Sequence, residues 1–139
     1  MILTATCTSY LLELLDGGVH LPGDDYRLVL LLPKTVGVYD ESLTRYGSIG
    51  QDELPAALGY LRGGARLTGR RATLIDGEPA LDFDDAVWPA ASFQTGGGVI
   101  VNASKDGRAL AVLSFGGVYV GNGSAFRVPM QGPVRLARR

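Results

Sequence analysis

ALDFDDAVWPAASFQTGGGVIVNASKDGRALAVLSF, residues Ala80 to Phe115, is the stretch that decides the fold. It joins short apolar runs through a charged corner, a glycine triplet and a polar turn. Leu81 and Phe83 alternate with Asp82, which is the pattern of a strand with one buried face. The run from Arg108 to Phe115 is apolar at nearly every position, as expected for a central strand covered on both faces. The stretch therefore predicts one half of a layered β structure.

Turn signals place further strands before this stretch. Asp76-Gly77 separates two β-rich runs, Ala72 to Ile75 and Ala80 to Phe83, and Asp-Gly between such runs is a strong hairpin signal. Tyr26 to Leu32 is a continuous apolar run that ends at Pro33, which predicts a strand buried on both faces.

The segment from Thr8 to Leu15 predicts the one helix of the fold. Its leucines recur at spacings of three and four residues and give it a broad apolar face. Thr8 or Ser9 can cap its start, and Gly17 can end it in a left-handed conformation. A helix this short is not stable alone, so we expect it to lie on the sheet.

The remaining sequence predicts irregular structure and a few more strands. Residues 34–71 have no sustained period and predict a long excursion with little sheet structure, of the kind that often carries function. Within it, Leu54 to Leu61 fits either one helical turn or an extended segment. Residues 116–124 predict a loop, and Ala125 to Met130 alternates again. The complete sequence predicts a single domain, residues 1–139, with about six to eight strands. The predicted fold is an all-β, jelly-roll-like antiparallel β-sandwich with one short N-terminal helix.

The composition is that of a folded protein without a strong electrostatic field. Hydrophobic residues make up 46% of the chain and charged residues 19%, which excludes a disordered chain. The net charge of -1 favours neither nucleic acid nor a membrane surface as a partner. The single cysteine, Cys7, cannot form an internal disulfide, which fits assembly in a reducing cytosol. The N-terminus predicts no signal peptide, and no apolar run approaches the ~20 residues that span a bilayer.

The sequence contains no residue pattern typical of a catalytic or metal site. His20 is the only histidine, and it predicts an ordinary turn residue. Asp82, Asp84 and Asp85 lack the ligand spacing of a calcium loop and predict an outward-facing strand residue followed by a solvated corner. The triplet Gly96 to Gly98 leads into a β run, where a phosphate loop would lead into a helix, so it predicts a strand that starts against a close backbone. We therefore predict no enzyme, no metal and no cofactor.

Trp88 leaves two interpretations open. Together with the tyrosines and Asp82 it could form a shallow carbohydrate-binding site. Its position between corner residues favours packing over the core instead.

The candidate contact residues are seven arginines in two groups: Arg62, Arg66, Arg70 and Arg71 before the deciding stretch, and Arg135, Arg138 and Arg139 at the C-terminal end. A guanidinium binds carboxylates through two parallel hydrogen bonds, so these groups could recognise acidic residues on a partner. The alternative is a solvated surface with no partner.

Several stretches, taken in order, resemble a family of small tailed-phage structural proteins. A short helix runs into LLDGGVHLPGDDYRLVLLLP (Leu14 to Pro33), and ALDFDDAVWPAASF follows at Ala80 to Phe93. GGGVIVNASKDGRALAVLSFGG (Gly96 to Gly117) and NGSAFRVPM (Asn122 to Met130) come next, and VRLA (Val134 to Ala137) closes the set. The ordered set resembles the jelly-roll cement proteins of short-tailed phages of the kind that infect Bordetella.

The resemblance implies a structural protein on the outside of an HK97-type phage capsid. Such proteins bridge neighbouring subunits of the major capsid protein, often as homodimers at two-fold positions. The resemblance also implies synthesis in the host bacterial cytoplasm and a final location on the outer capsid surface of the virion. Related sequences are labelled as head- or tail-fibre components, which leaves a fibre or receptor-binding module as the alternative. We expect shell or dimer contacts at an exposed strand edge or in the Lys34 to Leu61 excursion, and contacts of the arginines with acidic shell surface.

Overall fold

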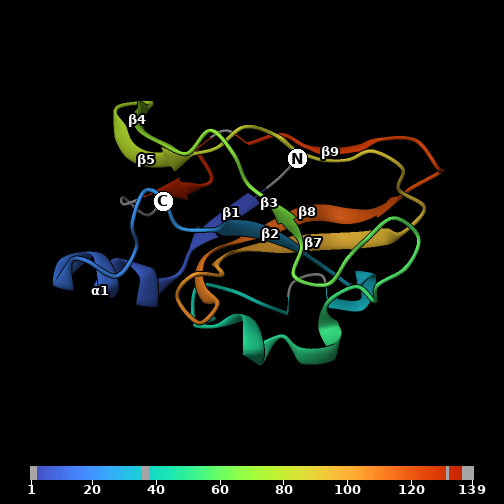
Figure 1. Cartoon of the computed structure of the whole chain (residues 1–139), viewed down its shortest axis with the longest axis horizontal. Helices are drawn as coiled ribbons and strands as arrows, with labels where there is room; N and C mark the ends of the chain where they lie inside the picture. Colours follow the sequence, from blue (N-terminus) through green and yellow to red (C-terminus); the bar gives the residue numbers. More distant parts are fainter. Residues whose placement is uncertain (1–2, 36–37, 131, 136–139) are drawn as a thin grey trace.

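Two long antiparallel strands, β7 (Gln94–Asn102) and β8 (Arg108–Val120), form the centre of a five-stranded sheet (Figure 1). β2 (Tyr26–Leu31) pairs with the other side of β7, and β1 (Leu3–Thr6) and β3 (Ala65–Arg66) form the two edges. The computed structural model describes residues 3–35, 38–130 and 132–135. Every side chain from the third residue of β2 to its end is buried, as the apolar run predicted.

A second layer faces this sheet and consists of two small antiparallel sheets. One contains β4 (Arg71–Ile75), β5 (Glu78–Asp82) and β10 (Val134–Arg135), and the other contains β6 (Ala86–Trp88) and β9 (Phe126–Val128). In the view of Figure 1, β4, β5 and β9 lie above the five-stranded sheet. The predicted all-β, jelly-roll-like sandwich is confirmed, with ten strands in the described part of the chain where about six to eight were expected.

The helix α1 (Thr8–Asp16) forms where it was predicted but packs differently. Tyr10 is buried, whereas Leu12 and Leu15 are 60% and 85% exposed. In Figure 1 the helix lies beyond one end of the sheet and not across its face. The helix was expected to lie on the sheet; it packs at the end of the sheet, with Tyr10 in the core and Leu11 partly buried against it.

The two ends of α1 differ in how well they were predicted. The N-cap position is Cys7, with no side-chain cap, so neither Thr8 nor Ser9 caps the helix. Gly17 does end it, with a φ of 73°, which a residue with a Cβ rarely adopts. No described helix is long and apolar enough to cross a membrane.

The predicted excursion is mostly irregular, as expected. At its start and within it, the described residues form three single-turn 3-10 helices: η1 (Pro33–Thr35), η2 (Tyr46–Ser48) and η3 (Gly50–Asp52). Residues 54–61 contain a turn closed by an isolated bridge between Ala57 and Tyr60, so the helical alternative was wrong. Figure 1 shows η2 and η3 below the sheet, on the side away from β4, β5 and β9.

Three placements differ from the prediction, and in two of them a strand runs through glycine. β7 begins at Gln94, so the triplet Gly96 to Gly98 lies inside a strand and not at its start. β8 continues through Gly116 and Gly117 to Val120, where a loop was expected. Trp88 lies on β6 and not in a corner.

Candidate partner-binding surfaces

The first group of predicted arginines interacts with groups of its own chain. The carboxylates that Arg62 and Arg71 contact, Glu53 and Asp82, are buried, so a partner could not take these two arginines without leaving a buried charge. The pair of Arg66 is more exposed, and such pairs contribute about 0–1 kcal/mol. The internal contacts are Arg62 with Glu53 (3.3 Å), Arg66 with Asp25 (3.7 Å), Arg70 over the ring of Tyr26 (5.9 Å to its centroid), and Arg71 with Asp82 (2.8 Å) and Asp84 (3.1 Å).

The second group is described only at Arg135. Its guanidinium lies 3.7 Å from Glu78 and donates a hydrogen bond to the carbonyl of Gly132 at 2.9 Å. Arg138 and Arg139 lie outside the described residues. Contact of these three arginines with a shell therefore stays a prediction.

Asp82 is buried, which corrects the expectation of an outward-facing carboxylate. Its residue is 8% exposed, and its carboxylate accepts hydrogen bonds from the backbone N–H of Gly132 and from Arg71, both at 2.8 Å. The cause is the return of the chain beside β5, because β10 pairs with Leu81 and Ala80. Asp82 therefore links the segment that leads into β10 to β5, and its carboxylate is not accessible to a sugar.

Trp88 is a core residue, as the packing interpretation predicted. It is 5% exposed and lies among three other aromatic rings, those of Tyr60, Phe93 and Phe126, at centroid distances of 6.4, 6.1 and 5.9 Å. Such edge-to-face and stacked pairs stabilise the space between the layers. Trp88 and Asp82 thus do not form a shallow carbohydrate-binding site.

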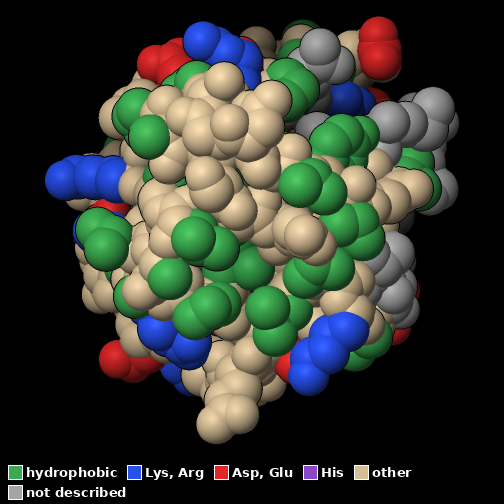
Figure 2. All heavy atoms as spheres, turned by 90° about the vertical axis from the view of Figure 1, so that its right-hand side faces the viewer, with side chains coloured by type: hydrophobic (Ala, Val, Ile, Leu, Met, Phe, Trp, Pro, Cys, Tyr) green, Lys and Arg blue, Asp and Glu red, His purple; other side chains and the backbone are tan. Residues whose placement is uncertain are grey.

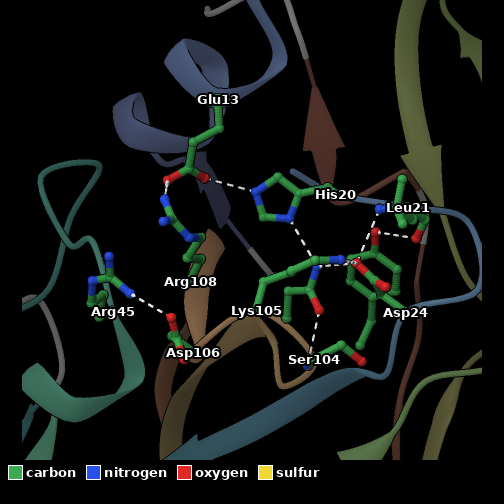
Figure 3. Close-up of polar contacts among 11 residues, drawn as sticks. Glu13, His20, Leu21, Asp24, Arg45, Ser104, Lys105, Asp106 and Arg108 are labelled. Atoms are coloured by element: carbon green, nitrogen blue, oxygen red, sulfur yellow. Dashed lines mark hydrogen bonds and ion pairs between the residues drawn. The ribbon is translucent and has the colours of Figure 1, made fainter. Parts of the chain in front are cut away.

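His20 is not an ordinary turn residue, because its ring is buried in a hydrogen-bonded network (Figure 3). Its side chain is 2% exposed, with Nε2 2.7 Å from Glu13 and Nδ1 3.0 Å from the amide nitrogen of Asn102. The N–H of Ser104 donates to the amide oxygen of Asn102, which fixes the amide nitrogen as the donor. Nδ1 of His20 therefore accepts, and Nε2 donates to Glu13. Both ring nitrogens are engaged, which gives His20 a structural role.

Two cations complete this network and connect distant segments. Arg108, at the start of β8, donates to Glu13 on α1 at 2.6 Å. Lys105 donates to Asp24 at 2.8 Å, and Asp24 also accepts from Asn102 at 2.8 Å. As Figure 3 shows, the residues converge from the helix, the following loop and the β7–β8 turn. The network and the buried ring of Tyr10 together hold α1 against the end of the sheet.

Asp24→Asn is expected to weaken the acid dependence of stability. Burial acts to raise the pKa of Asp24, but hydrogen bonds from Asn102, Lys105 and the backbone of Leu21 outweigh it and lower the pKa to about 2. Because this value is below that of the unfolded chain, the stabilisation is present above about pH 4 and is lost as the pH falls towards about 2.

The measurement is the urea midpoint of unfolding between about pH 5 and pH 2. The wild type should lose stability over this range more steeply than Asp24→Asn, which starts lower. Asp16→Asn, at an exposed position on α1, is the control and should follow the wild type. Identical pH slopes for Asp24→Asn and the wild type would contradict the assignment.

The thiol of Cys7 is not a candidate nucleophile. Its residue is completely buried, and burial, followed by the nearby charges of Asp40 and Glu13, raises the pKa of the thiol to about 12. The thiolate is the reactive form, so Cys7 is unreactive at neutral pH.

Hydrophobic side chains gather at one end of the molecule, which faces the viewer in Figure 2. We call this surface the apolar end and define it by Leu58, Leu61, Val118 and Val120. Their residues are 62%, 76%, 49% and 65% exposed, respectively. Exposed hydrophobic side chains that gather on one part of a surface often mark a site of protein–protein contact.

Backbone hydrogen bonds join both segments of the apolar end, residues 58–61 and 118–120, to the chain at residues 92–93. The N–H of Ser92 donates to the carbonyl of Leu58 at 2.8 Å, and the N–H of Gly121 donates to Phe93 at 2.8 Å. A Cβ on Gly59 would lie 2.0 Å from the carbonyl oxygen of Ala90, so only glycine allows this approach. The surface is therefore a fixed part of the fold.

Sequence reasoning did not find the apolar end. Its signal was present in the apolar triplet Val118 to Val120, but the preceding glycine pair, Gly116-Gly117, suggested a loop. Leu58 and Leu61, the other two residues of the apolar end, lie in the excursion that was expected to carry contacts.

Among the described residues, no group of three or more His, Cys, Asp and Glu side chains could hold a metal ion. No protein-family model matches this chain, and neither the curated proteins nor the solved structures contain a significant match.

Proposed function

We propose that this chain is a structural virion protein that binds the outside of an HK97-type phage capsid. It stabilises the shell by bridging subunits of the major capsid protein, and it does so as a homodimer. The proposal draws on the sequence resemblance to phage cement proteins and on the jelly-roll-like sandwich. The observation that carries it is the apolar end, which presents a fixed, exposed hydrophobic surface to a protein partner.

The physical effect of such binding is mass action. A protein that binds the assembled shell and not its dissociated subunits shifts the equilibrium towards the shell. Many contacts form on one particle when the protein bridges neighbouring subunits, so the affinity of each single contact can be low. A two-fold position requires a self-complementary patch on the chain.

Leu61→Glu is expected to reduce binding to shells assembled from the major capsid protein of the same phage. Leu61 is 76% exposed, so the charge costs the fold little but must be desolvated in a contact. Binding is measured by co-sedimentation of the purified protein with the shells, and a loss of about tenfold or more in affinity is expected.

Leu15→Glu is the matched control. Leu15 is 85% exposed on α1, away from the apolar end, and its replacement should leave binding unchanged. Equal binding of Leu61→Glu and Leu15→Glu would argue against the apolar end as the contact. No sedimentation of the wild-type protein with shells would argue against the proposed function itself.

A further inference from the structure

A groove of about 560 Å³ opens between the two layers of the sandwich. Leu113 and Phe115 of β8 lie on one side of it, and Phe126 and Val128 of β9 on the other. Tyr119, 45% exposed, also lines it. A cavity of this volume, with aromatic and aliphatic walls, is within the range of pockets that bind ligands or side chains.

One unpaired strand side, that of β9, borders the groove. In the described part of the chain, β9 pairs only with β6, and β10 lies at the edge of its sheet beside β5. β9 contributes three consecutive lining residues while its partner β6 contributes none, so the unpaired side of β9 faces the groove. The outer side of β10 is not open, because the N–H of Arg135 donates to the hydroxyl of Thr6 on β1 at 2.9 Å. β1, an edge strand of the large sheet, contributes Thr4. Unpaired strand sides can hydrogen-bond to an extended chain.

The charge of the residues that line the groove determines which extended chains it can bind. Arg127 and Arg135 line the groove, and none of its described lining residues is acidic. The side chain of Arg127 is 64% exposed and lies 3.3 Å from Asp85. A guanidinium has five N–H donors, so this ion pair is compatible with a second carboxylate. The groove is therefore complementary to an apolar segment that also carries an acidic residue.

We propose that the groove binds an extended segment of a partner protein, with a large apolar side chain in the cavity and a carboxylate at Arg127. The segment adds a strand beside β9, so main-chain hydrogen bonds supply affinity while the cavity and Arg127 supply specificity. The identity of the partner as a shell subunit rests on the proposed function. The groove itself and the chemistry of its occupant do not depend on the proposed function.

The probe is a displayed library of random peptides of about ten residues, which is long enough for a full strand. Selection on the purified protein should enrich peptides that alternate apolar and polar residues and contain Asp or Glu. The affinity of an enriched peptide should fall about tenfold or more in Tyr119→Ser, which removes an aromatic wall, and in Arg127→Glu, which reverses the charge.

Leu74→Ser is the matched control. Leu74 is 68% exposed on β4, outside both the groove and the apolar end, so this variant should bind the peptide like the wild type. Thermal unfolding of the variants shows that each one is folded. The proposal fails if no peptide is enriched, if the enriched peptides are basic, or if Tyr119→Ser binds them as well as the wild type does.

Two further readouts separate the possible occupants. If a second copy of the chain fills the groove, Tyr119→Ser will convert a dimer into a monomer in sedimentation, and a separate partner is excluded. If the groove variants lose peptide binding but still bind shells normally, the shell is not the partner of the groove. If peptide binding follows the prediction and the wild type does not bind shells, the groove proposal stands and the proposed function fails.

Discussion

Glu53→Ala is expected to lower the free energy of unfolding by about 3–5 kcal/mol, because it removes a buried acceptor that several donors share. Glu53 is 1% exposed and accepts hydrogen bonds from the hydroxyls of Tyr46 and Tyr60, both at 2.5 Å, and from the N–H of Gly63 at 2.8 Å. Arg62 lies 3.3 Å away. Removal of the carboxylate leaves these donors without an acceptor, and each buried donor left unpaired costs about 1–3 kcal/mol.

The hydroxyls that Glu53 binds remain donors over a wide pH range. Burial, followed by the hydrogen bond to Glu53, raises the pKa of both Tyr46 and Tyr60 above the ordinary tyrosine value. Because the folded pKa is the higher one, their stabilisation is complete below about pH 10 and is lost only at more alkaline pH. The comparison of Glu53 variants can therefore be made at neutral pH.

The measurement is urea unfolding of Glu53→Ala, Glu53→Gln and the control Gln51→Ala. Glu53→Gln keeps one acceptor oxygen and should lie between the wild type and Glu53→Ala. Gln51 is exposed on the neighbouring 3-10 helix η3, and its replacement should change stability by less than about 0.5 kcal/mol. A loss below about 1 kcal/mol in Glu53→Ala would show that the excursion is held by apolar packing and not by this carboxylate.

Gly97→Val is expected to lower the free energy of unfolding by about 3 kcal/mol. Gly97 lies in the middle of β7, between β8 and β2. A Cβ at this position would lie 2.6 Å from the carbonyl oxygen of Leu113, a backbone atom of a central strand that cannot move alone. The neighbouring Gly98 is similarly enclosed, because a Cβ there would lie 2.9 Å from both the carbonyl oxygen of Val29 and Cδ1 of Leu28.

Gly117→Ala on β8 is the control for this prediction. No heavy atom lies within 4 Å of a Cβ at Gly117, so alanine should be neutral or stabilise by up to about 1 kcal/mol through a less flexible unfolded chain. Thermal unfolding of both variants gives the comparison. Similar losses in the two variants would mean that glycine is needed for its backbone freedom and not for the close approach to Leu113.

Local patterns predicted the features that depend on local chemistry. Asp76 and Gly77 have φ values of 51° and 79°, which fits the hairpin turn that Asp-Gly favours. The pairing of Ile75 with Glu78 confirms that the loop has two residues. The apolar run of β2 and the glycine at the end of α1 were predicted correctly for the same reason.

Features that depend on distant partners could not be predicted from the pattern. Glycine is unfavourable in strands, so Gly96 to Gly98 suggested a strand start, whereas close packing against β2 and β8 places it inside one. His20 gave no local sign of burial, because its partner Asn102 is 82 positions away. The same holds for Glu53, whose role depends on two tyrosine hydroxyls brought to it by the irregular segment.

The central proposal is that the chain stabilises a capsid from outside. The most direct test compares particles that carry this protein with particles of the same phage that lack it, heated in the presence of a DNA-binding dye. The proposal predicts that the particles lacking the protein release DNA at a lower temperature and that added purified protein restores the higher temperature. Equal release temperatures for the two kinds of particle would contradict it.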